Sequence, residues 1–154
     1  MGLEIALWQP QIPSNTGNIA RTCVVTSCPL HLIEPLGFSI EEKAVKRAGL
    51  DYWFDLDLTL WPNLDSFLSH MSGKPVYAFT TKAKQTYSNV QFAEDSIFLF
   101  GSETQGLPNS YLKTHDQNLL RIPMLEGHRS LNLANSVAIV AYEYLRQFNY
   151  PDLL

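Results

Sequence analysis

The feature that most restricts the fold is a long apolar segment towards the end of the chain, 131–145 (LNLANSVAIVAYEYL). On a helix drawn through it, apolar residues fall on every side, which is typical of a helix that is covered all round in a protein core. Asn132, Asn135 and Ser136 nevertheless lie on neighbouring positions of one stripe near its start. Either Ser130 or Asn132 caps the helix, or these polar groups form the floor of a ligand site, because buried polar side chains need partners.

Shorter apolar runs alternate with helical patterns along the rest of the chain. Each run is stopped by Pro, Gly or polar residues, as expected for strands of a buried sheet. This alternation predicts an α/β fold, with a mostly parallel sheet, helices on both of its faces and a single domain over residues 1–154. The expected strands are 4–8, 31–33, 53–58, 76–80, 97–100 and 118–122, and the expected helices are 14–26, 39–49, 63–71, 108–114 and 131–150.

The composition restricts the partners. Eleven Lys and Arg against fifteen Asp and Glu give a net charge of −4, so any RNA must be held by local groups and not by a general basic field. The first residues lack a basic leader pattern, and no run of about 18 apolar residues could cross a bilayer, so we expect a cytosolic protein. Cys23 and Cys28 have no second pair and the four histidines are scattered, so we expect no metal and two reduced cysteines.

Three expected strands end in polar loops, with the sequences TKAK, GSETQGLP and PMLEGHRS. Parallel strands open their carboxyl ends on one edge of a sheet, and ligands of such sheets bind there. We therefore expect one crevice formed by these three loops, with the first strand-to-helix turn, QPQIPSNTGNIAR, brought to the same edge.

The loop GSETQGLP contains two glycines and a single carboxylate. Gly101 and Gly106 allow close approach to a ligand or a positive φ, and Glu103 lies between them. A tight strand-to-helix turn would explain the same glycines. The loop is neither a P-loop, because no Lys-Ser or Lys-Thr follows, nor the G-x-G-x-x-G pattern of nicotinamide-dependent dehydrogenases.

The segment NTGNIAR places Asn15, Asn18 and Arg21 three residues apart on one helix face. A guanidinium beside two amides would bind a phosphate in a bidentate manner or pair with Glu103. A solvent-exposed helix face would show the same spacing.

Taken together, SNTGNIARTC, FGSETQGLP and RIPMLEGHRSLNLANSVAIVAYE resemble, in order and spacing, the three motifs of the SPOUT superfamily of RNA methyltransferases, in its SpoU-like ribose 2′-O-methylating branch. The resemblance extends through HLIEPLGF and KRAGLDYW and covers nearly the whole chain. It implies S-adenosylmethionine as methyl donor, a homodimer and a C-terminal trefoil knot. It also implies that the substrate is the ribose of a tRNA, at the wobble nucleotide (C or U) of leucine tRNAs. Methylation of rRNA, and a non-catalytic protein that binds RNA or a nucleotide, are the alternatives.

The motifs also assign residues to roles. Arg21 takes the position of the catalytic arginine, and we expect it to stabilise the developing alkoxide and clamp the neighbouring phosphate instead of acting as a base, because a guanidinium stays protonated. The residues expected to orient Arg21 and the ribose are Asn15, Glu103, Ser130 and Asn135; those expected to hold the adenosyl group are Phe79, Gly101, Ile122, Met124, Ser130 and Leu131. The residues expected to contact RNA are Lys43, Lys46, Arg47, Arg129 and Tyr142.

Overall fold

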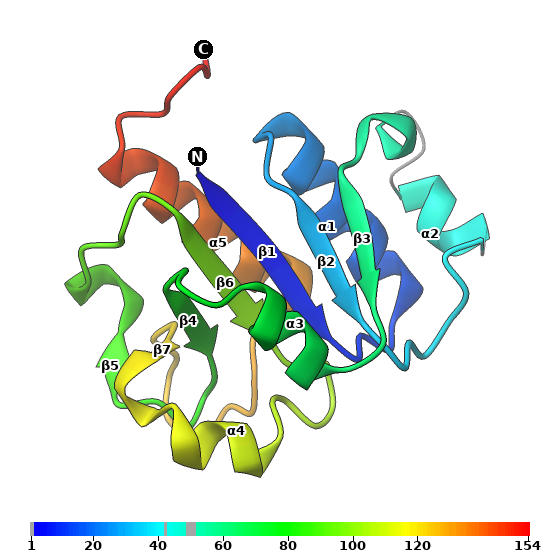
Figure 1. Cartoon of the computed structure of the whole chain (residues 1–154). Helices are drawn as coiled ribbons and strands as arrows, with labels where there is room; N and C mark the ends of the chain where they lie inside the picture. Colours follow the sequence, from blue (N-terminus) through cyan, green and yellow to red (C-terminus); the bar gives the residue numbers. More distant parts are fainter. Residues whose placement is uncertain (1, 42, 49–51) are drawn as a thin grey trace.

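The computed structural model describes residues 2–41, 43–48 and 52–154 and has a twisted parallel sheet at its centre (Figure 1). The sheet order is β3-β2-β1-β6-β4-β7-β5, and every pairing is parallel. This confirms the α/β fold expected from the alternation of apolar runs and helical patterns. The strands are β1 (Leu3–Trp8), β2 (Leu30–Ile33), β3 (Leu58–Trp61), β4 (Val76–Phe79), β5 (Gln85–Thr86), β6 (Ser96–Phe100) and β7 (Leu119–Arg121).

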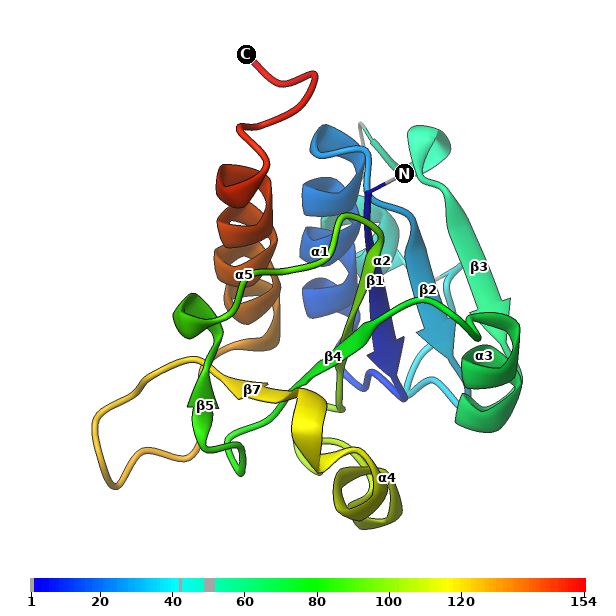
Figure 2. The same ribbon diagram turned by 60° about the vertical axis from the view of Figure 1, so that its left-hand side comes forward.

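Helices cover both faces of the sheet, as Figures 1 and 2 show. One buried cluster joins α1 and α5 to one face, through residues such as Ile5 and Phe98, and the other joins α3 and α4 to the opposite face, through Ala6 and Ile97. Neighbouring residues of one strand thus serve different cores, as the two-residue period of a strand requires. The helices are α1 (Pro13–Val25), α2 (Lys43–Ala48), α3 (Leu64–His70), α4 (Asn109–Thr114) and α5 (Leu133–Gln147), with 3-10 turns η1 (Trp53–Asp55), η2 (Tyr87–Asn89) and η3 (Asp116–Asn118).

The strand expected at 53–58 was wrong. Trp53 and Leu56 pack against the first core cluster from a 3-10 turn, while Phe54 between them is 95% exposed. The strand starts only at Leu58, which pairs with Leu30. A weak alternation of apolar residues fits a single turn of 3-10 helix as well as a strand.

The expectation that the last helix is covered all round was also wrong. Val137, Val140 and Ala141 are fully buried, but Ile139 is 39% and Tyr142 45% exposed. The apolar residues on the outer side of α5 are therefore only partly covered by the part of this chain that the structure describes.

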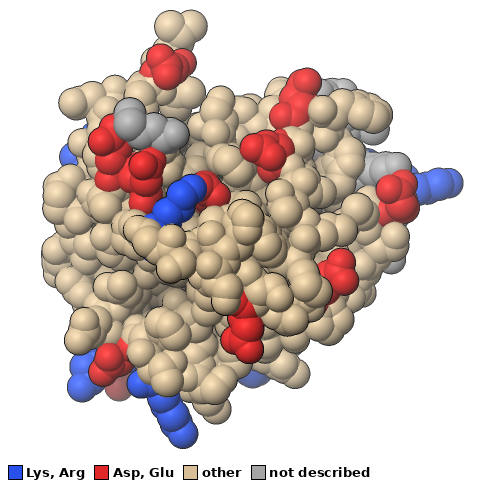
Figure 3. All heavy atoms as spheres, in the orientation of Figure 1, with Lys and Arg blue, Asp and Glu red and all other residues tan. Residues whose placement is uncertain are grey.

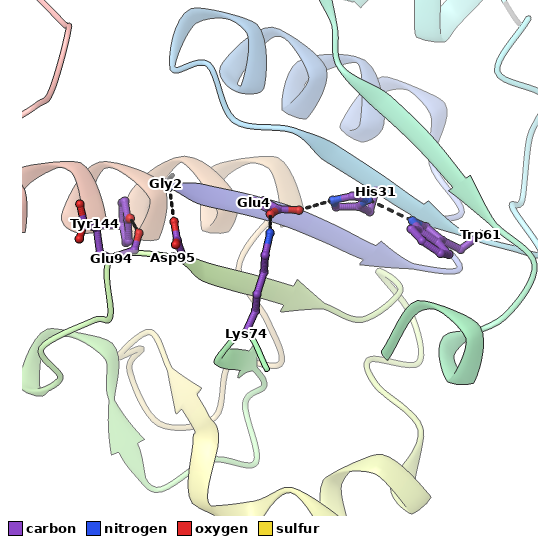
Figure 4. Close-up of polar contacts among 8 residues, drawn as sticks. All are labelled: Gly2, Glu4, His31, Trp61, Lys74, Glu94, Asp95 and Tyr144. Atoms are coloured by element: carbon purple, nitrogen blue, oxygen red, sulfur yellow. Dashed lines mark hydrogen bonds and ion pairs between the residues drawn. The ribbon is translucent and has the colours of Figure 1, made fainter. Parts of the chain in front are cut away.

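A chain of polar side chains crosses the sheet on the face away from α1 and α5 (Figure 4). Glu4 on β1 accepts hydrogen bonds from Lys74 and from His31 on β2, the latter over 2.7 Å. His31 is 5% exposed, and its Nδ1 accepts from the indole N–H of Trp61 over 3.0 Å, so its proton is on Nε2. The hydrogen bond from His31, followed by that from Lys74, lowers the pKa of Glu4 to about 2.

Candidate active site

A cavity of about 530 Å³ lies at the carboxyl ends of β4, β6 and β7, where the sequence predicted a crevice. Its walls come from the loops that follow these three strands and from the starts of α1 and α5. All six residues expected to hold the adenosyl group line it: Phe79, Gly101, Ile122, Met124, Ser130 and Leu131.

The loop after β6 folds back on itself at the cavity. Ser102 and Gly106 exchange backbone hydrogen bonds of 3.3 and 2.9 Å, and Gly106 has a φ of +68°. A Cβ atom on Gly101 would lie 2.0 Å from the carbonyl carbon of Gly106 and 2.2 Å from the nitrogen of Leu107. The close neighbour that makes Gly101 necessary is thus the backbone of its own loop.

Glu103, at the tip of this loop, holds the start of α1. Its carboxylate accepts from the backbone nitrogens of Gln11 and Ile12 over 2.7 and 3.0 Å, and from the side-chain amide of Asn15 over 3.3 Å. The N-cap residue of α1 is Ile12, which has no side chain able to cap. Glu103 therefore supplies, from more than ninety residues away in the chain, negative charge and hydrogen-bond acceptors where a helix N-terminus needs them.

Asn132 connects the third motif to the first. Its side-chain nitrogen donates to Asn15 over 3.1 Å, and its side-chain oxygen caps α5 by accepting from the backbone nitrogen of Asn135 over 3.1 Å. Of the two caps considered from the sequence, the structure selects Asn132. The sequence offered Asn132 as a cap or as part of a ligand floor but did not include it among the assigned site residues, although it forms the link from Glu103 through Asn15 to α5. Asn135, expected in the site, contributes a backbone donor to this cap, and its side chain is exposed.

Arg21 lies apart from the cavity within the protomer. Its side chain is exposed on α1, and its guanidinium carbon lies 4.7 Å from the ring centroid of Tyr52. Among the residues that the structure describes, Glu103 pairs with the start of α1, so the alternative of an ion pair with Arg21 was wrong within one protomer.

The residues expected to contact RNA fall into separate groups. Arg129 lines the cavity, as does Lys82, whose ammonium donates to Asn109 over 3.1 Å. Lys43 and Arg47 are exposed on α2, which packs against α1. Tyr142 lies on the exposed side of α5, and the side chain of Lys46 lies outside the described part of the structure.

Metal and membrane features can be assessed over the described ranges 2–41, 43–48 and 52–154. In them, no cluster of three or more His, Cys, Asp and Glu side chains could hold a metal ion. None of the helices in these ranges combines the length and the apolarity that crossing a membrane requires.

The sequence matches the SpoU rRNA methylase family over residues 2–142. The chain belongs to this family. A curated relative from Aeromonas hydrophila, a tRNA (cytidine(34)-2′-O)-methyltransferase, is 50% identical, and the alignment covers 99% of this chain and 98% of the relative. The resemblance stated from the three motifs is thereby confirmed.

Solved structures of SpoU methylases share the fold. One, described as giving structural insights into the 2-OH methylation of C/U34 on tRNA, has a TM-score of 0.91 and 43% identity, with 96% of each chain covered. An AdoMet-bound rRNA methyltransferase from Sinorhizobium meliloti has a TM-score of 0.84 and 25% identity, with 94% of this chain and 56% of that chain covered. The SpoU fold is thus shared both with a relative of the same length and with the larger rRNA enzyme.

Proposed function

We propose that this protein transfers a methyl group from S-adenosylmethionine to the 2′ hydroxyl of a tRNA ribose, at the wobble nucleotide (C or U) of leucine tRNAs. The observation that supports it most is the link from Glu103 through Asn15 to Asn132, since it joins all three family motifs at one cavity. The Aeromonas hydrophila relative, half of whose residues are identical, is a methyltransferase of cytidine 34 in tRNA.

The cavity fits the adenosyl group of S-adenosylmethionine. Its volume of about 530 Å³ lies in the range of small-molecule sites. Phe79, Ile122 and Leu131 offer apolar walls for a flat base, and the rings of Phe79 and Phe100 stack with centroids 4.9 Å apart, which holds one wall in place. The AdoMet-bound relative from Sinorhizobium meliloti, which shares the fold, supports the same cofactor.

We propose further that a second copy of the chain covers the outer side of α1 and α5. Val25 on α1 and Ile139 and Tyr142 on α5 are 45%, 39% and 45% exposed, and they are large hydrophobic residues on helices that pack against each other. Arg21 is exposed on the same α1 helix, so in a dimer it can reach the cavity of the partner. Ile139→Asp places a charge in this interface, and we expect monomers in analytical ultracentrifugation; an unchanged dimer would contradict the assigned interface.

In this dimer, Arg21 stabilises the negative charge that develops during methyl transfer. When bound, S-adenosylmethionine supplies an activated methyl group with a good leaving group. Arg21 donates hydrogen bonds to the ribose O2′ as negative charge develops on it and to the adjacent phosphate. The proton of the hydroxyl passes to water or to the phosphate, because the guanidinium has no free acceptor and keeps its own protons.

RNA binding in this proposal is local and sensitive to salt. The net charge is −4, and on the face shown in Figure 3 the basic side chains gather mainly at the lower edge, in the region of α4 and β5. Lys82 and Arg129 lie at the cavity, and Lys43 and Arg47 lie on α2 beside α1. Affinity for tRNA should therefore fall steeply as salt is raised, and a flat response would contradict electrostatic binding. We propose that the protein methylates tRNA in the cytoplasm.

The deciding experiment is incubation with labelled S-adenosylmethionine and total tRNA, followed by mapping of the methylated nucleotide. We expect 2′-O-methylation at position 34 of leucine tRNAs. Arg21→Lys should lower turnover by about 100-fold, the typical effect of removing one oxyanion donor, with unchanged cofactor affinity. Methylation of rRNA alone would show that the substrate is rRNA and not tRNA. Cofactor binding without transfer to any RNA would show that the protein binds its ligands without catalysing the reaction.

We also propose the trefoil knot that the family resemblance implies. Strand β7 pairs with β4 on one side and β5 on the other, both earlier in the chain, and the chain then continues to α5, which packs beside α1 on one face of the sheet. Pulling the two ends apart in a single-molecule experiment should give a final extension shorter than the full contour length. An extension equal to that length would contradict the knot.

A further inference from the structure

The guanidinium of Arg21 contacts an aromatic ring. Its guanidinium carbon lies 4.7 Å from the ring centroid of Tyr52. Among the described residues, no carboxylate or carbonyl accepts a hydrogen bond from it, whereas Arg146 donates to both oxygens of Glu143 over 2.8 and 2.9 Å. An aromatic face orients the cation without occupying its N–H donors.

Tyr52 is itself fixed to the body of the protein. Its carbonyl accepts from the backbone nitrogen of Asp55 over 3.0 Å, which closes η1, and the next residue, Trp53, packs against the core cluster that contains α1. The half-buried ring of Tyr52 is thus attached to an anchored turn that contacts α1. Phe54, on the same turn, is 95% exposed and has no such support.

We propose that Tyr52 is a positioning residue for the reaction: its ring holds the guanidinium of Arg21 ready to bind the ribose oxygen and phosphate at the cavity of the partner subunit. This inference rests on the proposed function of Arg21. A carboxylate in the place of Tyr52 would fill the guanidinium fork, and water alone would leave the long side chain free to rotate. The ring leaves the N–H donors free and already restricts the side chain, so Arg21 loses less conformational entropy when the substrate binds.

The test compares Tyr52→Leu with Tyr52→Phe, and Phe54→Leu is the control that removes an aromatic ring from the same turn. Tyr52→Leu should lower kcat by about two- to fivefold, the range expected for an exposed cation–π contact. The Kd for S-adenosylmethionine should stay unchanged, since neither residue lines the cavity of its own protomer and, in the proposed dimer, Arg21 binds the ribose oxygen and phosphate of the RNA. Tyr52→Phe and Phe54→Leu should keep the kcat of the parent protein. If Tyr52→Leu unfolds, Tyr52→Gln provides the same comparison.

A double-mutant cycle separates positioning from a structural role. In the Arg21→Ala background, Tyr52→Leu should cause no further loss in single-turnover rate, because no cation remains to be held. The same two- to fivefold loss in both backgrounds would refute the positioning role. If Arg21→Ala is inactive and Tyr52→Leu is fully active, the positioning role of Tyr52 is refuted and the proposed role of Arg21 stands. An Arg21→Ala protein with normal turnover would refute the proposed role of Arg21, and that of Tyr52 with it.

Discussion

Replacing Glu103 with glutamine separates an anchoring role for its carboxylate from a role in the chemistry. The carboxylate accepts from the backbone nitrogens of Gln11 and Ile12 and from Asn15. Glutamine keeps one oxygen but turns an NH₂ group towards donors, so at least one hydrogen bond to a charged group is lost. Such bonds contribute about 1.5–3 kcal/mol, and partial exposure of the site favours the lower end.

We therefore expect the free energy of unfolding to fall by about 1.5 kcal/mol, which for a chain of this size lowers Tm by about 3–6 °C. Urea unfolding followed by circular dichroism measures the first quantity, and calorimetric titration with S-adenosylmethionine shows whether the loop at the cavity has shifted. Glu126→Gln, the same change at an exposed residue of the loop after β7, is the control and should leave both unchanged. Glu103→Gln with normal stability but no turnover would show that the carboxylate acts on the substrate. Normal stability with normal turnover would refute anchoring altogether.

Three further predictions concern the cavity loop, the cross-sheet polar chain and the thiols. Gly101→Ala should weaken cofactor binding by at least about tenfold in calorimetry, because the loop must move when a Cβ lies 2.0 Å from its backbone. The control is Gly73→Asn, at a glycine with a φ of +94° outside the cavity lining; it can strain its own turn but should leave cofactor binding unchanged. The pKa of Glu4 is lowered to about 2 in the folded protein from 4.5 in the unfolded chain, so its contribution to stability is present above pH 4.5 and is lost towards pH 2. In Glu4→Gln, the midpoint of urea unfolding should therefore depend less on pH between 4.5 and 2 than in the parent protein. Burial raises the pKa of both thiols, Cys23 and Cys28, so iodoacetamide should label them at pH 8 only after unfolding, and rapid labelling of the folded protein would contradict their burial.

The position of the cavity could be predicted because it depends on sheet topology. Residues such as Phe79, Gly101 and Ile122 directly follow or end apolar runs, and parallel strands bring such positions to one edge. No knowledge of the contacts between loops was needed for that step.

The contacts inside the site could not be predicted in the same way. That Glu103 would bond to the backbone of Gln11 and Ile12, and not to Arg21, depends on the path of a loop that folds back through Ser102 and Gly106. Backbone donors also carry no mark in a sequence, whereas an arginine invites pairing with any nearby acid. Side-chain spacing offered Arg21 as one possible partner for Glu103, and within one protomer that alternative was wrong.

The exposed side of α5 illustrates a second limit. Ile139 and Tyr142 fit an apolar pattern that is typical of a fully covered helix, yet this chain leaves them 39% and 45% exposed. A pattern of apolar residues indicates apolar surroundings but does not say whether they come from the same molecule or another. Cover by a second copy, as proposed above, would reconcile the pattern with the structure.

The hydrogen bond between Asn132 and Asn15 joins residues 117 positions apart. During synthesis the first helix leaves the ribosome long before α5 exists, so a nascent chain has half of this amide pair and an incomplete cavity floor. The segment that carries Asn132 thus decides when the pocket is complete, and a translation product interrupted before it would carry the first two motifs without a closed site.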